Sequence, residues 1–271
     1  MNCAIQVEGL RKSYGGRAVL KGLDLQIAKG EIFALLGANG AGKTTTLECI
    51  EDLRTCDGGR VAVHGRVGIQ LQSSSLPAHI RPMEAVRLFS KWNRAAADPA
   101  MLAALGIDAL AKKQYVQLST GQKRRLHLAL ALIGDPDIVF LDEPTAGLDV
   151  EGRVQLHDQI RRLKAQGRTI ILASHDMAEV EALCDRIAIL SGGAIAYLGP
   201  VSGLAEAVGG RCTITIQTPQ GEESVRSNDL SATLLALLEG CREKGVPVLD
   251  VRIDHGSLEQ NFIHIAGGNG K

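Results

Sequence analysis

The chain has 271 residues, of which 45% are hydrophobic and 22% are charged, a composition typical of a folded globular protein rather than a disordered one. Its 30 basic and 30 acidic residues cancel, which argues against a broad basic surface for nucleic acid or a polybasic membrane anchor. Only 3% of the residues are aromatic, too few to favour a stacking platform for RNA.

The N-terminal residues and the cysteines indicate where the protein works. The N-terminus has no basic region followed by an apolar stretch, so we expect no signal peptide. No apolar run reaches the roughly 18 residues that a membrane span needs. The six cysteines lie far apart without a C-x-x-C pair, which favours reduced thiols over a disulfide frame or a zinc site. We therefore expect a cytoplasmic protein.

Short apolar runs alternate with helical patterns along the first 200 residues. Buried or half-buried strands are expected at 19–27, 31–36, 138–141, 170–173 and 187–190. Helices are expected at 44–53, 124–133, 152–165 and 177–184, and residues 82–113, which lack any strand signal, predict a helical insertion. This alternation predicts a mostly parallel sheet that helices cover on both faces.

A glycine-rich motif follows the strand expected at 31–36. Residues 37–44, GANGAGKT, fit the pattern G-x-x-x-x-G-K-[ST] between a strand and a helix. Glycines let consecutive backbone N–H groups point at phosphate oxygens, and the helix N-terminus adds partial positive charge. We expect Lys43 to reach the β- and γ-phosphates and Thr44 to hold Mg²⁺ through its hydroxyl. The nucleotide-binding residues expected in this loop are Gly37, Asn39, Gly40, Ala41, Gly42, Lys43, Thr44 and Thr45.

Two carboxylates, Asp142 and Glu143, follow the apolar run at 138–141. An acid at that place can hold the Mg²⁺ that bridges the phosphates, and the next acid can orient or deprotonate the attacking water. Alone, such acids are often a solvated strand end or a helix cap, but downstream of a phosphate loop they favour the catalytic interpretation. The two motifs predict a P-loop nucleotidase and do not choose among kinases, GTPases and motors.

The segment 118–122, Leu-Ser-Thr-Gly-Gln, separates these classes. It resembles the LSGGQ signature of the ATP-binding subunits of ABC transporters, and the order of the other motifs matches that family along nearly all of residues 1–200. By this resemblance Tyr14 stacks on adenine, Gln72 is the switch glutamine that also helps to bind Mg²⁺, and His175 is the switch histidine. The catalytic residues implied are Glu143, His175 and Gln72, and the Mg²⁺ ligands are Thr44, Gln72 and Asp142.

The signature and the segment 146–149, which resembles the D-loop, imply how ATP is bound. Ser119 and the amide of Gly121 open a second helix N-terminus, expected near Gln122, that suits an anion. In the family, each ATP is sandwiched between the phosphate loop of one copy and the signature of the other. The resemblance therefore adds Ser119, Gly121, Gln122 and Asp149 to the nucleotide-binding residues.

Two positions need separate comment. Gln70 lies two residues before Gln72 and has the same side-chain chemistry, although the spacing of the family favours Gln72 as the switch. Thr120 stands where the family has glycine. Because a β-branched residue disfavours positive φ, we expect an ordinary backbone angle at Thr120.

The pattern changes near residues 199–210, where glycines and proline interrupt the chain. Strands at 212–217 and 246–253 and an amphipathic helix at 230–244 predict a small α+β extension at 206–271, after an ATPase domain at 1–205 with a helical subdomain at about 76–134. The resemblance implies the α/β fold of P-loop NTPases, with a RecA-like, mostly parallel sheet, an antiparallel β subdomain and a helical insertion.

The resemblance also implies partners. One phosphate loop and one signature imply a homodimer or a heterodimer with a like subunit. A separate multi-span permease would insert a short helix into a groove near 72–92. The candidate contacts there are Leu76, Ile80, Met83, Leu88 and Phe89.

The C-terminal pattern at 246–262 resembles the extension of bacterial ABC-2 type exporter ATPases of the multidrug- and daunorubicin-resistance-like subgroup. The expected function is ATP hydrolysis, with ATP and Mg²⁺, that powers export of an unknown substrate from the inner face of the cell membrane. No contact with nucleic acid or with the cargo is expected. An importer ATPase subunit and a non-transport ABC ATPase that acts on ribosomes or DNA are alternatives.

Overall fold

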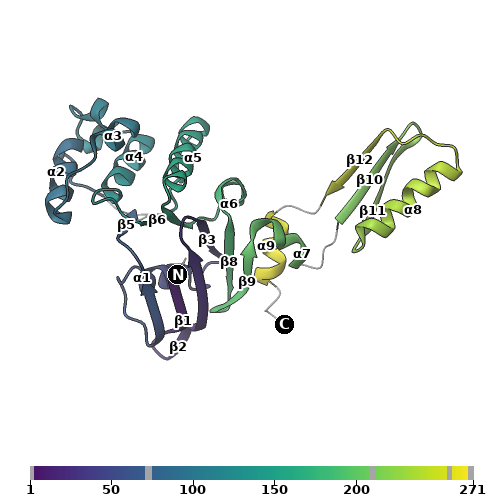
Figure 1. The fold of residues 1–271 in the computed structure, drawn as a ribbon, viewed down its shortest axis with the longest axis horizontal. Coiled ribbons are helices and arrows are strands. Elements are labelled where there is room, and N and C mark those ends of the chain that lie inside the picture. Colours follow the sequence, from purple (N-terminus) through teal and green to yellow (C-terminus); the bar gives the residue numbers. More distant parts are fainter. Residues whose placement is uncertain (1–2, 71–74, 208–211, 255–257, 268–271) are drawn as a thin grey trace.

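The computed structural model describes residues 3–70, 75–207, 212–254 and 258–267. Within these residues the strands form three sheets, shown in Figure 1. The largest has the order β5-β6-β7-β3-β8-β9, with parallel pairing from β5 to β8 and an antiparallel edge strand. Its strands are β3 (Ile32–Gly37), β5 (Val67–Gln70), β6 (Ile138–Asp142), β7 (Thr169–Ala173), β8 (Arg186–Ser191) and β9 (Ala194–Pro200). The expected mostly parallel sheet is confirmed.

Both faces of the central strands of this sheet are buried. Along β3, Ala34 and Leu36 belong to one hydrophobic cluster, while Phe33 and Leu35 belong to another. Alternate residues of a strand point to opposite faces, so burial on both sides requires a continuous apolar run. This is why the sequence of β3 shows no alternation of apolar and polar residues.

Each hydrophobic cluster is completed by a different layer of the protein. A second, antiparallel sheet contains β1 (Cys3–Tyr14), β2 (Arg17–Ala28) and β4 (Gly58–Val63) in the order β2-β1-β4, and it shares one cluster with α1 (Lys43–Ile50). The other cluster is covered by α2 (Pro82–Asn93), α3 (Pro99–Ala104), α4 (Thr120–Ala131), α5 (Val150–Ala165) and α6 (Met177–Leu183). Short 3₁₀ turns lie at Asp108–Leu110, Tyr115–Gln117 and Val201–Gly203.

The carboxyl ends of three parallel strands meet at one edge of the large sheet. Ala173, the last residue of β7, is paired with Leu35 of β3 on one side and with Asp142 of β6 on the other. Ligands of open α/β sheets bind at this edge, outside the carboxyl ends of the strands. The fold therefore brings the phosphate loop after β3 close to the acids after β6.

The residues expected as a single extension, 206–271, lie in two places. A third sheet, with β10 (Cys212–Thr218), β11 (Gly221–Ser227) and β12 (Asp250–Asp254) in the order β11-β10-β12, packs with α8 (Leu230–Glu243) around Ile214 and Ile216. Figure 1 shows this unit, here called the small domain, set apart from the large sheet.

The last helix, α9 (Leu258–Gly267), returns to the ATPase core. It packs against β8 beside the short helix α7 (Leu204–Ala207), and the Ser191 hydroxyl of β8 donates to the Ala266 carbonyl at 3.0 Å. Strand β11 was not among the expected elements, and β12 begins four residues later than the strand expected at 246–253.

Candidate nucleotide site

The phosphate loop requires glycine where α1 begins. Gly42 precedes the helix with φ of 106°, and a Cβ at this position would lie 2.6 Å from Leu20 Cδ2. Because side chains disfavour such a φ and this space is already filled, only glycine fits. The first N–H groups of a helix have no acceptor within it, so those at the start of α1 are available to an anion.

Lys43 points back into this loop. Its Nζ donates to the carbonyl of Gly37 at 2.6 Å and to the carbonyl of Ala38 at 3.2 Å. Burial lowers the pKa of Lys43, while the carboxylates Glu143 and Asp142 act on that pKa in the opposite direction. The ammonium group is thus held among weak acceptors, which phosphate oxygens would replace with stronger charge-assisted hydrogen bonds.

A cavity of about 560 Å³ opens beside the loop. That volume lies within the usual range for small-molecule sites. Its lining includes seven of the expected residues, Tyr14, Asn39, Gly40, Gly42, Lys43, Thr44 and Thr45. Gly37 and Ala41 are not part of this lining: Gly37 ends β3, and the side chain of Ala41, within the loop, is buried.

Some residues of this cavity were missing from the sequence analysis. Arg17 and Lys21 of β2 line it together with Gly193, and the Lys21 N–H donates to the Gly193 carbonyl at 2.9 Å. Gly193 has φ of 84°, and a Cβ there would lie 2.3 Å from the Val19 carbonyl oxygen. No motif joins these residues, because they come together only when β2 meets the turn after β8. The two cations add positive charge to the cavity that Lys43 also lines.

Tyr14 is exposed at the edge of this cavity. The guanidinium Cζ of Arg54 lies 5.4 Å from the centroid of its ring, and Lys12 Nζ lies 5.6 Å from it. Such cation–π contacts hold an aromatic ring in place. Tyr14 thus lines the cavity with its ring held by two cations, and its stacking on adenine stays a prediction.

Glu143 and His175 are in direct contact. The Glu143 N–H donates to the Ala173 carbonyl at 2.8 Å, and Glu143 Oε1 lies 2.7 Å from His175 Nδ1. This hydrogen bond is the main cause of the raised pKa of His175, which remains exposed on its other sides. Glu143 has φ of 48°, a left-handed conformation that is unusual outside glycine and concentrated at functional sites.

The structure places two of the three expected Mg²⁺ ligands, Thr44 and Asp142, and does not describe the third, Gln72. Asp142 ends β6, and its charge acts on Lys43 across the site. Asp142 and Thr44 offer carboxylate and hydroxyl oxygens, a donor set that fits Mg²⁺. Gln72 lies outside the described residues. Gln70, its rival, is only 2% exposed, and its amide atoms make no hydrogen bond among the described residues, so it faces the packed interior.

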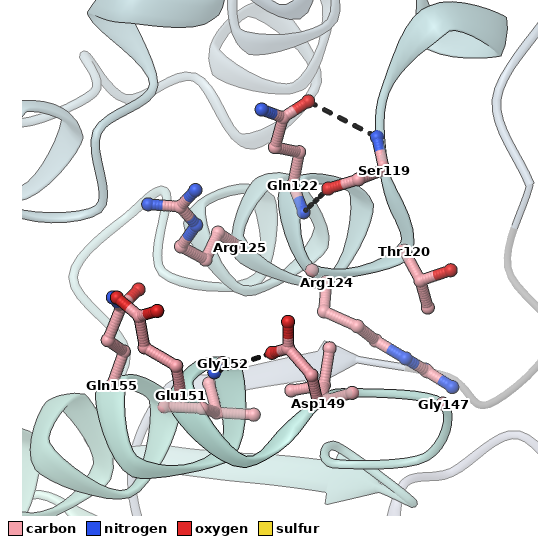
Figure 2. Close-up of a pocket in the computed structure, with 13 residues that line it drawn as sticks. Ser119, Thr120, Gln122, Arg124, Arg125, Gly147, Asp149, Glu151, Gly152 and Gln155 are labelled. Atoms are coloured by element: carbon pink, nitrogen blue, oxygen red, sulfur yellow. Dashed lines mark hydrogen bonds between the residues drawn. The ribbon is translucent and has the colours of Figure 1, made fainter.

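The signature segment forms a capping box. The Ser119 hydroxyl accepts from the Gln122 N–H at 3.3 Å, and Gln122 Oε1 accepts from the Ser119 N–H at 3.2 Å, as Figure 2 shows. These two bonds start α4 at Thr120, four residues before the helix expected at 124–133 and two before the start expected near Gln122. Thr120 takes an ordinary helical backbone, as expected for a β-branched residue.

A second cavity, of about 390 Å³, lies between the starts of α4 and α5 (Figure 2). Asp149 caps α5 by accepting from the Gly152 N–H at 2.8 Å. The cavity lining includes Ser119, Thr120, Gly121, Gln122, Gly147 and Asp149. It shares no residue with the lining of the phosphate-loop cavity. The signature and the phosphate loop of one chain thus face different cavities.

Known proteins resemble this chain in sequence and in fold. The model of the ABC transporter family matches residues 20–146. A daunorubicin resistance ATP-binding protein of Streptomyces coeruleorubidus is 30% identical, over 97% of this chain and 96% of its own length. A Nod factor export ATP-binding protein I of Paraburkholderia xenovorans is 36% identical, over 76% of this chain and 74% of its own length.

A solved ATP-binding subunit of an ABC transporter has the same fold. It superimposes with a TM-score of 0.67 at 24% identity, over 75% of this chain and 92% of that one. The fold, the order of the motifs and a relative aligned over nearly the whole chain lead to one conclusion: the chain belongs to the ATP-hydrolysing, ATP-binding subunits of the ABC transporter family.

Proposed function

We propose that this chain hydrolyses ATP to power export through a separate membrane permease. The observation that carries the proposal is the contact of 2.7 Å between Glu143 and His175, beside a phosphate loop whose lysine points inward. Glu143 polarises the attacking water and accepts its proton, and His175 holds the Glu143 carboxylate. Lys43 and the loop N–H groups bind the phosphates.

Mg²⁺ belongs to this proposal. Thr44 and Asp142 supply oxygen ligands, and Gln72 is the further ligand that the family resemblance implies. When bound, the ion would neutralise charge on the β- and γ-phosphates, as in other P-loop ATPases. Tyr14 would fix the base, and the cations Arg17 and Lys21 would attract the triphosphate.

We further propose that two subunits complete each site. The phosphate loop and the signature of one chain line separate cavities, so a nucleotide bound at the first is left without signature contacts. Head-to-tail pairing of two copies, or of this chain with a like subunit, supplies Ser119 and the Gly121 N–H from the partner. ATP then joins the two subunits, and its hydrolysis separates them.

A membrane partner would supply the pathway for the cargo. No helix among the described residues is long and apolar enough to span a bilayer. Of the candidate contacts near 72–92, Leu76, Ile80, Met83 and Phe89 pack against the core, whereas Leu88 is exposed. Trp92, on the same helix α2, is 77% exposed. We place the permease contact at Leu88 and Trp92, which puts this subunit on the inner face of the cell membrane.

The direction of transport rests on the relatives. Two of them are named for daunorubicin resistance and for Nod factor export. The first aligns along 97% of this chain, a share that requires the C-terminal part to be included. We propose export on this basis and assign no cargo.

The experiment is purification of the tagged chain from its own membranes, with and without ATP, as the wild type and as Glu143→Gln. We expect a multi-span permease to co-purify. We also expect Glu143→Gln to bind ATP normally, to form a stable ATP-dependent dimer and to lose hydrolysis by about 10²–10⁴-fold, the usual contribution of a general base. Glu181→Gln, on the exposed side of α6, is the matched control.

Hydrolysis by Glu143→Gln at the parent rate would show that Glu143 is not the base. Recovery of the chain with ribosomes or DNA and no membrane protein would leave an ATPase but overturn the transport proposal.

A further inference from the structure

Glu179 is a buried acid directly behind the site just described. It lies on α6 and is 1% exposed, although it belongs to none of the motifs of the sequence analysis. Burying a carboxyl group is costly unless hydrogen bonds compensate. The residues around Glu179 should therefore supply the hydrogen bonds that offset the cost of its burial.

Two of those neighbours come from the two loops that hold the proposed catalytic pair. The Ser174 hydroxyl donates to Glu179 Oε2 at 2.5 Å, and the Thr145 hydroxyl is hydrogen-bonded to the same carboxyl group. Ser174 immediately precedes His175, and Thr145 follows Glu143 by two residues. One carboxyl group thus connects the loop of the histidine with the loop of the glutamate.

The other surroundings of Glu179 do not compete for these hydroxyls. Glu179 Oε1 lies 3.6 Å from Nε2 of the nearly buried His157 on α5, and among the described residues neither atom has a hydrogen-bond partner. The Glu179 N–H donates to Asp176, and Asp176 in turn pairs with Arg153 at 2.8 Å. Burial raises the pKa of Glu179 and lowers that of His157, which disfavours a charged pair between them.

We propose that Glu179 is a positioning residue for hydrolysis: through Ser174 and Thr145 it fixes the two loops so that His175 and Glu143 stay in contact. This inference rests on the proposed function of Glu143. It deepens that function by adding a residue that acts through the catalytic pair and touches no nucleotide. A displacement of a catalytic group by about 1 Å can lower the rate 10²-fold. Two hydrogen bonds that prevent such a displacement can therefore change the rate of hydrolysis measurably.

The test measures kcat and KM for ATP, ATP affinity at equilibrium and Tm for the full chain together with its permease. Glu179→Ala removes the shared acceptor, and we expect kcat to fall at least tenfold while KM and ATP affinity change less than twofold. Glu179→Gln keeps the volume and one acceptor oxygen, so it should recover most of the lost kcat. The exposed Glu181→Gln on the same helix is the control for charge.

Two further variants keep the test valid if Glu179→Ala fails to fold. Ser174→Ala and Thr145→Val each remove one hydroxyl, and each should lower kcat with KM preserved. In the Glu143→Gln background, Glu179→Ala should cause no additional loss, because residues that act as a unit are not additive.

An unchanged kcat in Glu179→Ala, or a fall in kcat that merely follows the fall in Tm, would overturn the inference. If the wild type hydrolyses ATP and Glu143→Gln does not, the proposed function stands whatever Glu179→Ala shows. If Glu143→Gln hydrolyses ATP at the parent rate, the proposed role of Glu143 is wrong, and the inference on Glu179 falls with it.

Discussion

The contact between Glu143 and His175 has a measurable electrostatic effect. The hydrogen bond that the protonated His175 ring donates to the Glu143 carboxylate raises the pKa of His175 above its ordinary value, so the imidazolium form persists to higher pH than in a free histidine. The pair adds to the free energy of unfolding. This contribution is complete below the pKa of His175 in the unfolded chain and is lost as the pH rises through its raised pKa in the folded protein.

We expect Glu143→Gln to move the pKa of His175 down toward the ordinary value, because the amide carries no charge. An NMR titration of the histidine ring in nucleotide-free and metal-free protein measures this shift, with Glu181→Gln as the control. Identical titration curves for the wild type and Glu143→Gln would show that the contact is not made in solution.

Lys43 is the second residue whose removal has a definite expected effect. Lys43→Ala should weaken ATP binding by about 10–100-fold, the equivalent of one or two charge-assisted hydrogen bonds to phosphate. Equilibrium binding of ATP measures this change. Lys112→Ala, which removes an exposed lysine far along the chain from the loop, should leave the affinity unchanged.

The site residues that the sequence predicts are those that lie in contiguous motifs. Lys43 and Glu143 are found because their neighbours in sequence carry the same chemistry. Glu179 and Lys21 were missed because neither belongs to a contiguous motif, and the residues that each meets come from distant segments. Gln70 and Gln72 could not be separated by chemistry alone, and burial of Gln70 is a property of the folded sheet.

At the level of elements, the start of α1 depends on Gly42. Gly42→Ala should lower the free energy of unfolding by about 1–3 kcal/mol, because the residue would keep a positive φ and its methyl would meet Leu20. Denaturant unfolding and ATP binding should both report the change.

Gly240→Ala is the matched control for Gly42→Ala. Gly240 lies inside α8 without a positive φ, and a Cβ added there would meet no heavy atom within 4 Å beyond its own helix backbone and chain neighbours. Alanine should therefore be neutral there or stabilise the small domain by about 1 kcal/mol. If Gly42→Ala and Gly240→Ala lowered the free energy of unfolding equally, backbone strain at Gly42 would not be the cause of the loss.

The elements that the sequence predicts well are those buried on two faces or strongly periodic. The buried strands β3, β6, β7 and β8 coincide with the expected apolar runs to within a residue or two. Strand β11 escaped prediction because its sequence, GEESVRS, is charged and largely exposed, so no burial pattern marks it. The early start of α4 is set by the capping box at Ser119 rather than by apolar periodicity.

For the whole molecule, the position of α9 is the largest difference from expectation. Nothing in a sequence of amphipathic elements says which of two cores a final helix will join. The side chain of Leu258 is 8% exposed and belongs to the same hydrophobic cluster as the large sheet, so α9 is part of the ATPase core.

We expect Leu258→Ala to lower the free energy of unfolding of the ATPase core by about 2–3 kcal/mol, as loss of a buried leucine does. Ile263→Ala on the same helix removes a side chain that is 60% exposed. This substitution should change the free energy of unfolding by less than about 0.5 kcal/mol. Chemical denaturation monitored on the core distinguishes the two. A Leu258→Ala protein as stable as the wild type would show that α9 is not docked in solution.

Because α9 packs on the ATPase core, the small domain is inserted between two helices of that core, α7 and α9. The chain leaves the core after α7 and comes back at α9, and these two helices pack side by side. Helix α9 packs against β8, and Leu190 of β8 is paired with Gly37 at the start of the phosphate loop. A displacement of α9 would therefore act on the strand that is paired with the first residue of the phosphate loop.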